Sequence, residues 1–181
     1  MPNDFSHPSQ LGLTSSETIE TLLQRRSIRK YNDTPVTDDQ VDAILKAAFR
    51  APTSSNIQSY TVITVRNPET KQRLAVPTGN QQHIIDCPVF LAFCADLTRL
   101  EHVLKERNHT LGNNNLEIGL VSSIDASLVG MSAYLAAESL GIKGVMIGAV
   151  RNDAGKIAEI LELPKFVFCV FGMCLGYPAE M

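Results

Sequence analysis

Apolar residues recur at the helical period in two segments near the start of the chain. The first segment, TSSETIETLLQRR, places Ile19, Leu22 and Leu23 on one face of a helix. Thr14 and Glu17 have the spacing of a capping box, which predicts that this helix begins beside Thr14. The second segment, TDDQVDAILKAAFRAP, follows the same pattern, with Thr37 and Gln40 as the capping pair. Its buried stripe consists of Val41, Ile44, Leu45 and Ala48.

Strand-like patterns follow the two helices. SYTVITVR alternates between apolar and polar positions and is rich in β-branched residues, as half-buried strands are. PVFLAFCAD and FVFCVFGMCLG are continuous apolar runs, which are typical of strands covered on both faces. The predicted strands are 59–66, 88–96, 144–148 and 166–176.

The longest predicted helix covers about residues 116–140 and is apolar around most of its circumference. Such a helix must be buried on all sides, either within the domain or against a second subunit. Helices mixed with fully covered strands indicate a three-layer domain of the α+β or α/β class. The 181 residues fit a single domain, which we place at 14–181 after a loose N-terminal segment at 1–13.

Composition and charge narrow the choice of function. The chain is 44% hydrophobic with a net charge of −3, which describes a globular protein and argues against a nucleic-acid binder. The chain does not open with a charged-then-apolar signal region, and Glu117, Asp125 and Glu138 interrupt the longest apolar stretch. We therefore expect neither export nor a membrane span. The four cysteines form no C-x-x-C pair and are expected to be reduced core residues of a cytoplasmic protein.

A basic run, QRRSIRKYND, gathers a quarter of the 16 lysines and arginines into residues 25–30. Cations that follow a helix complement the negative end of its dipole, and this is one interpretation of the run. Arginine side chains also bind phosphate oxygens bidentately, and the hydroxyl of Ser27 adds a neutral donor. Charge alone leaves both interpretations open.

Two further segments carry candidate chemistry. APTSSNIQSY offers hydrogen-bonding side chains at five of six positions from 53 to 58, which suits a polar turn or a site for a flat polar ligand. LGIKGVMIGAVRND does not have the G-x-G-x-x-G spacing, but Gly144 and Gly148 bracket a strand that a backbone or ligand approaches closely. No hydrolase, Walker or metal-ligand motif is present, so an enzyme of this kind would rely on a cofactor.

In this order, the three segments resemble the nitroreductase family of FMN-dependent oxidoreductases. RRSIRKY is similar to the family's R-R-S-x-R-x-F/Y opening, and APTSSNIQSY is similar to its A-P-S-S-x-N-x-Q-P-W. TGNQQHIIDCPVFLAFCADLTR and AAESLGIKGVMIGAVRND more closely resemble the NADPH-dependent, oxygen-insensitive nitroreductase and flavin reductase branch. The resemblance runs from about residue 17 to the end, and it implies an α+β fold whose mostly antiparallel central sheet is flanked by helices.

The resemblance also implies where FMN binds. Arg25, Arg26, Ser27 and Arg29 are similar to the run that contacts the phosphate and the isoalloxazine ring. The other implied contacts are donors from the second subunit at Ser54 and Asn56, a flavin-contacting Gln81, and a backbone segment beside the ring at Met146, Ile147, Gly148 and Ala149.

The implied activity belongs to a homodimer with flavin at the subunit interface, where the helix at 116–140 packs. In this family the flavin takes a hydride from NADPH or NADH and reduces a nitroaromatic, a quinone, free flavin or a similar small aromatic oxidant. The cofactor carries this chemistry, so no catalytic side chain and no metal are implied.

Two features depart from the family pattern. Ser59-Tyr60 replaces Pro-Trp, which keeps a flat aromatic side chain, and the sequence ends at Met181 before the branch's basic K-P-R segment and C-terminal extension. Two other hypotheses therefore stand beside the oxidoreductase. One is a flavin-binding or flavin-storage protein without turnover, and the other is a scaffold whose basic run only caps a helix.

Overall fold

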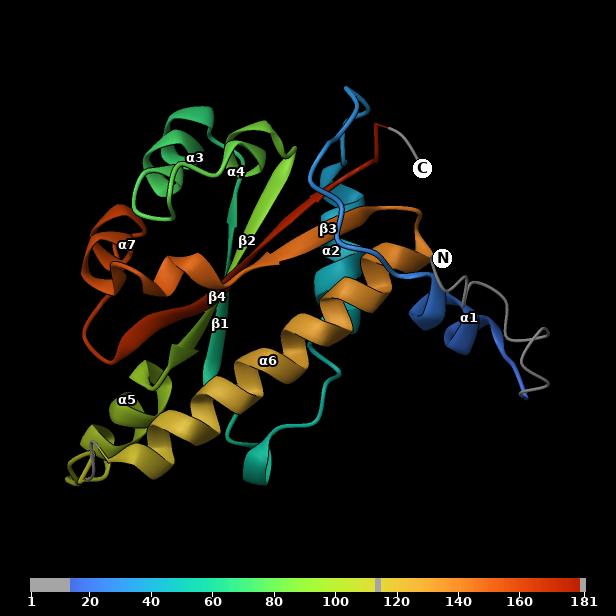
Figure 1. Cartoon of the computed structure of the whole chain (residues 1–181). Coiled ribbons are helices and arrows are strands. Elements are labelled where there is room, and N and C mark those ends of the chain that lie inside the picture. Colours follow the sequence, from blue (N-terminus) through green and yellow to red (C-terminus); the bar gives the residue numbers. More distant parts are fainter. Residues whose placement is uncertain (1–13, 113–114, 180–181) are drawn as a thin grey trace.

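Four antiparallel strands form the centre of the molecule in the order β1-β2-β4-β3 (Figure 1). The computed structural model describes residues 14–112 and 115–179. The strands are β1 Tyr60–Val65, β2 Val89–Asp96, β3 Lys143–Ile147 and β4 Val167–Gly176. The α-helices are α1 Glu17–Gln24, α2 Asp38–Ala48, α3 Pro68–Ala75, α4 Gln82–Asp86, α5 Thr98–Glu106, α6 Leu116–Ser139 and α7 Ala154–Ile160; the 3₁₀ turns are η2 Ser54–Asn56 and η3 Gly148–Arg151.

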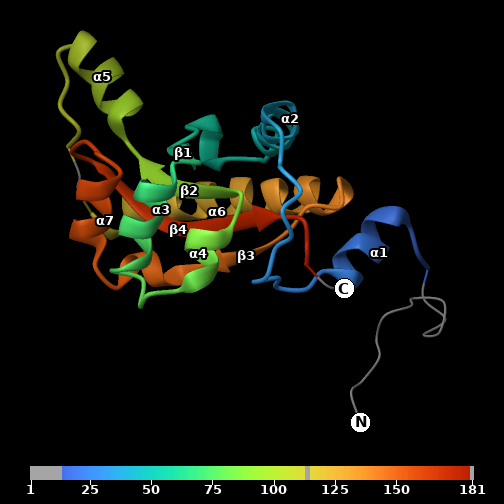
Figure 2. The same cartoon turned by 90° about the horizontal axis from the view of Figure 1, so that it is seen from above.

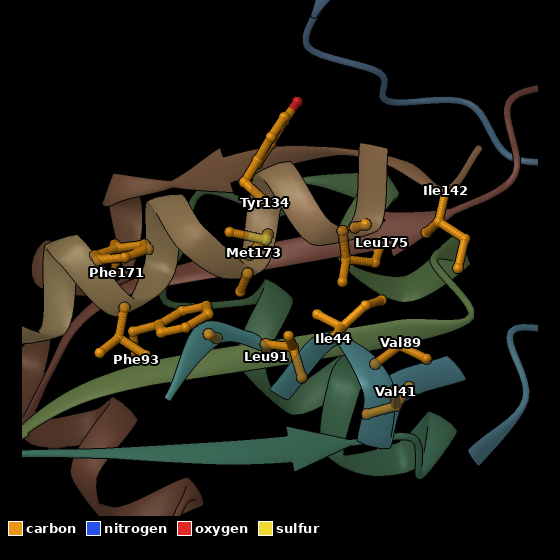
Figure 3. Close-up of a cluster of buried hydrophobic side chains, with 14 of the residues drawn as sticks. Val41, Ile44, Val89, Leu91, Phe93, Tyr134, Ile142, Phe171, Met173 and Leu175 are labelled. Carbon is orange, nitrogen blue, oxygen red and sulfur yellow. The ribbon is translucent and has the colours of Figure 1, made fainter. Parts of the chain in front are cut away.

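The sheet separates two hydrophobic cores, because neighbouring residues of a strand point to opposite faces. All eight residues of β2 are buried, as its continuous apolar run predicted. Leu91 and Phe93 face a core shared with α2 and α6, where they lie near Ile44 and Met173 (Figure 3). The alternate residues of β2 face a second core, which α3, α4 and α7 cover (Figure 2). The α+β prediction is confirmed, because every strand pair in the sheet is antiparallel.

Helix α6 runs across the sheet and contacts all four strands (Figure 1). Its buried residues include Asp125 and Glu138. By length and composition alone, α6 is long and apolar enough to cross a membrane, with a window of mean hydropathy 1.4, although three acidic residues interrupt its sequence. The same length and apolarity belong to the core helix of a globular protein, and α6 lies in the first core.

Several boundaries differ from the sequence prediction. Helix α1 begins at Glu17 with Ser16 as its N-cap, because the Ser16 hydroxyl accepts the hydrogen bond from the Ile19 N–H. The capping box predicted at Thr14 was therefore wrong, whereas the one at Thr37 and Gln40 is confirmed. Helices α3, α4, α5 and α7 are short, and the sequence analysis did not predict them. The N-terminal segment predicted at 1–13 lies outside the described residues.

Candidate functional site

The basic run leaves helix α1 and continues as extended chain beside strand β3. Ser27 forms a parallel bridge with Gly144, and the Ile28 N–H donates to the Gly144 carbonyl over 2.9 Å. The last turn of α1 contains no basic residue, and the helix ends at Gln24. The cations therefore lie mostly beyond the helix end, which weakens the interpretation that they serve only to complement its dipole.

Gly144 is required at this bridge because the backbones approach closely. A Cβ atom at this position would lie 2.2 Å from the Cys174 carbonyl oxygen in the neighbouring strand β4. The predicted close approach is thus confirmed at Gly144, and the approaching group is backbone. At Gly148 the nearest atom to such a Cβ is the flexible end of Arg151, at 3.2 Å.

Tyr134 of α6 attaches the basic run to the core. Its hydroxyl donates to the carbonyl of Gly144 over 2.7 Å and lies 3.2 Å from the carbonyl of Arg26. The guanidinium of Arg25 lies 5.4 Å from the centre of the Tyr134 ring and donates to its hydroxyl over 3.4 Å. Burial raises the pKa of the Tyr134 phenol, so it remains a donor at neutral pH. Sequence reasoning missed this residue because its role depends on where α6 crosses β3.

The remaining polar side chains of the basic run are exposed and could contact a ligand. Arg26, Ser27, Arg29 and Lys30 are all exposed. Within the ranges that the structure describes, none of these cations forms an ion pair with a carboxylate. Four unpaired positive charges in six positions constitute a site that favours an anion.

Helix α4 brings two further residues to this region. Burial lowers the pKa of His83, and the nearby positive charge of Arg29 lowers it further. The His83 Nε2 atom is buried and has no hydrogen-bond partner among the described residues. Gln81 directly precedes α4, and its side-chain nitrogen donates to the Thr78 carbonyl over 2.9 Å. Arg29 and the start of α4 are therefore neighbours, although 50 residues separate them in sequence. No motif signalled His83.

The segment from Met146 to Ala149 lies at the opposite end of β3 from the basic run. Met146 is 42% exposed, whereas the Ile147 side chain is buried in the second core. Ile147 as a whole is only 2% exposed, so a ligand can reach this segment at the exposed Met146 and Gly148 and at the half-buried Ala149. Gly144 and Ile147 are about 10 Å apart along an extended strand. A ligand that contacts both regions must be elongated, with its anionic group at the Gly144 end.

Within one chain, the polar loop at residues 53–59 does not lie beside the basic run. It is fastened to Asp125 of α6, whereas the basic run is fastened to Tyr134. Nine residues of helix correspond to about 14 Å of rise and about half a rotation around the axis. Ser54 and Asn56 are therefore on the other side of α6 from Arg25, which is compatible with their acting on a second copy.

The described residues contain no cluster of three His, Cys, Asp or Glu side chains that would hold a metal ion. The four cysteines are free and buried, which confirms their assignment to the core. The candidate site therefore consists of unpaired cations, amide and hydroxyl donors and exposed backbone. Groups of these kinds can bind and orient a ligand, but they carry no electrons, so redox chemistry at this site requires a cofactor.

Comparison with known proteins agrees with this description. The model of the nitroreductase family matches residues 22–177, and the chain belongs to this family. It is 39% identical over 168 residues to a Bacillus subtilis protein named FMN reductase (NADPH), covering 92% of this chain and 68% of that protein. An oxygen-insensitive NADPH nitroreductase of Salmonella typhimurium is 39% identical over 165 residues, which are 91% of this chain and 67% of the relative.

A solved structure supports the same assignment. NADPH:FMN oxidoreductase from Vibrio harveyi, complexed with NAD+, superposes with a TM-score of 0.86 at 36% identity, covering 91% of this chain and 70% of that one. The predicted family and its fold are thus confirmed. The chain spans about two thirds of the length of these relatives.

Proposed function

We propose that this protein is an FMN-dependent oxidoreductase that uses NADPH or NADH to reduce nitroaromatics, quinones, free flavin or similar small aromatic oxidants. The observation that carries the proposal is the unpaired basic run held by Tyr134 and Gly144 beside β3. The names of the relatives supply the activity, since they refer to FMN reductase and NADPH nitroreductase. Residues 14–181 form one catalytic domain, and a cytoplasmic location matches its four free cysteines.

The residues present fit FMN. Arg26, Ser27 and Arg29 would hold the phosphate with charge-assisted hydrogen bonds, and Arg25 would add positive charge from its place over Tyr134. The Gln81 amide and the backbone of residues 146–149 would orient the ring. Bound FMN supplies the hydride chemistry. The backbone N–H groups at Gly148 and Ala149 would stabilise negative charge on the ligand, because such donors are already oriented when the ligand binds.

The protein acts as a homodimer in this proposal. Helix α6 exposes an apolar stripe at roughly every fourth residue, with exposed fractions of 37–78%, and α1 exposes a second apolar face. A continuous apolar helix face of this kind normally contacts another protein surface. Pairing through α6 would also supply Ser54 and Asn56 to the site of the other subunit. The stripe consists of Leu116, Leu120, Ile124, Leu128 and Met131.

Sedimentation velocity tests the dimer. Ile124→Glu places a charge in the stripe, and we expect it to produce a monomer at concentrations where the wild type sediments as a dimer. Val76→Glu is the matched control, because Val76 is 63% exposed and follows α3 on the other side of the sheet. Equal sedimentation coefficients for wild type and Ile124→Glu would overturn this interface.

Visible absorption spectroscopy tests the activity. The purified protein is titrated with FMN, then mixed anaerobically with NADPH or NADH, and finally with a quinone. Loss and recovery of the bound flavin band support the oxidoreductase. A bound band that neither nucleotide bleaches would support flavin storage, and absence of binding would refute the cofactor assignment.

A charge-removing variant tests the cofactor residues. Arg29→Gln is expected to weaken FMN binding by about 10- to 100-fold, because hydrogen bonds between charged groups contribute roughly 1.5–3 kcal/mol. Arg107→Gln removes an exposed arginine beyond α5 and serves as the control. Equal affinities for these two variants would exclude Arg29 from the site.

A further inference from the structure

The polar loop between α2 and β1 has an unusual backbone. Ser55, Asn56 and Gln58 have φ angles of 49°, 54° and 55°, and none of them is glycine. The left-handed conformation is sterically unfavourable for an L-residue, and asparagine tolerates it better than serine or glutamine. Three such residues within four positions require contacts elsewhere that hold the loop in place.

Asp125 supplies three of those contacts at both ends of the loop. One carboxylate oxygen accepts the Ser54 N–H over 2.9 Å. The other accepts the Ser59 N–H over 3.2 Å and the Ser59 hydroxyl over 2.9 Å. Asp125 is 1% exposed and Ser59 is 2% exposed, so these bonds are shielded from water. A single buried carboxylate thus joins the two residues that flank the left-handed segment, Ser54 and Ser59.

A second side chain supports the end of the loop from the opposite direction. The Arg99 guanidinium in α5 donates to the carbonyl of Gln58 over 2.5 Å and to that of Tyr60 over 2.8 Å. Arg99 is exposed, whereas Asp125 is enclosed. Hydrogen bonds that exclude water restrict a backbone more strongly, so Asp125 is the principal restraint.

The backbone bonds leave the loop side chains directed toward solvent. Ser54, Ser55, Asn56 and Gln58 are all exposed, although the flanking Ser59 is buried. The loop follows α2 and passes beside α6 on its way to β1, drawn in teal in Figure 1. Asp125 directly follows Ile124 of the exposed stripe, so the carboxylate connects the loop to the helix proposed as the dimer interface.

We infer that Asp125 is a positioning residue, which holds Ser54 and Asn56 in place to donate hydrogen bonds to the flavin of the second subunit. The inference rests on the proposed flavin function and adds a residue to it. Without the carboxylate, the left-handed segment relaxes toward more favourable φ angles, and the two donors no longer point in a fixed direction. FMN then binds more weakly, while the fold of the remaining chain persists.

Amide hydrogen exchange of the flavin-free protein tests the restraint itself. In Asp125→Ala we expect the amides of Ser54 and Ser59 to exchange at least about tenfold faster, because their buried acceptor is gone. Asp125→Asn keeps one oxygen for Ser54 but turns an NH₂ group toward the two Ser59 donors, so only the Ser59 amide should lose protection. Unchanged exchange at both amides would overturn the inference.

Titration with FMN tests the functional consequence. We expect Asp125→Ala to raise the Kd for FMN by about 10- to 100-fold, with Asp125→Asn in between. Val129→Ala is the matched control, because Val129 is fully buried one turn further along α6 and its apolar side chain offers no hydrogen bond to the loop. A Kd for Asp125→Ala equal to that for Val129→Ala would make the carboxylate merely structural and refute the inference.

Two further results separate the possible failures. If the wild type binds no FMN, both the proposed function and the positioning role fail, even where exchange at Ser54 and Ser59 responds to Asp125. If wild-type binding is normal but no variant changes it, only the positioning role fails. Should Asp125→Ala not fold, Ser59→Ala removes one of the three bonds with little change in volume. We then expect it to raise the Kd about threefold, and no rise would refute the role.

Discussion

Substitution of Tyr134 by phenylalanine removes one hydroxyl group from the point where α6, β3 and the basic run meet. The hydroxyl donates to the Gly144 carbonyl over 2.7 Å and lies 3.2 Å from the Arg26 carbonyl. The phenylalanine ring retains the apolar packing of the buried tyrosine, and it still presents an aromatic face to Arg25. The experiment therefore isolates the contribution of the hydroxyl group, which donates to the carbonyls of Gly144 and Arg26 and accepts from Arg25.

The hydrogen bonds of the Tyr134 hydroxyl set the expected loss of stability in Tyr134→Phe. A neutral hydrogen bond contributes about 0.5–1.5 kcal/mol, and a carbonyl left without a partner would add a further penalty. Gly144 avoids that penalty because its oxygen still accepts the Ile28 N–H over 2.9 Å. We expect Tyr134→Phe to lower the free energy of unfolding by about 1 kcal/mol, which corresponds to about 2–4 °C in Tm for a protein of this size. The Kd for FMN should rise less than about tenfold.

Urea denaturation and FMN titration measure both effects. Tyr177→Phe is the control, because the Tyr177 hydroxyl accepts a 2.8 Å bond from Gln40, whereas the bond between Tyr177 and the basic run is the backbone one from Asn32, which the substitution keeps. It should lose similar stability but leave the Kd unchanged. A stability loss above about 3 kcal/mol for Tyr134→Phe would mean that the substitution disturbs more than the hydrogen bonds of the hydroxyl. An unchanged Kd would refute the claim that Tyr134 positions the run.

Three further predictions concern stability. Gly144→Ala should prevent folding, because its Cβ would lie 2.2 Å from the Cys174 carbonyl oxygen; circular dichroism of the purified variant would reveal a native spectrum if this reasoning were wrong. Lys71→Met should lower the free energy of unfolding by about 2–3 kcal/mol in urea denaturation, since the buried ammonium donates to the Ile85 carbonyl over 3.0 Å and to that of Cys87 over 2.5 Å. Burial raises the pKa of Tyr31, so its stabilising contribution is complete below the unfolded value of about 10 and is lost as pH rises further. In Tyr31→Phe the free energy of unfolding should therefore fall less steeply with pH between about pH 10 and 11.5 than in the wild type. An equally steep fall in both proteins would contradict this explanation.

The strands and the longest helix were predictable because their patterns are strong and local. The run 88–96 had to be covered on both faces, and all residues of β2 are indeed buried. The short helices α3, α4, α5 and α7 were missed because five to nine residues contain too few turns to establish a period. The start of α1 was misplaced because Ser16 and Thr14 are both good N-caps, and only the observed hydrogen bond to Ile19 distinguishes them.

Some residues of the candidate site were likewise predictable from the sequence, and others were not. Arg25, Arg26, Ser27 and Arg29 were identifiable because cations are rarely concentrated in so few positions of an acidic chain. Their neighbour His83 was not, since its proximity to Arg29 arises only when α4 packs beside the run. The sequence predicted that these groups bind an anion, but it did not indicate which residues hold them in place.

The sequence by itself determined the elements with strong periodicity, the local excess of positive charge and, through its motifs, membership of the nitroreductase family. These properties belong to neighbouring residues, and a reader of the chain finds them without knowing the fold. Only the tertiary structure revealed the hydrogen bonds of Tyr134 and Asp125, which the sequence shows only as members of the predicted helix. Their hydrogen bonds join α6 to segments more than 60 residues away, because packing against the sheet brings distant polar groups to distances of 2.9–3.2 Å.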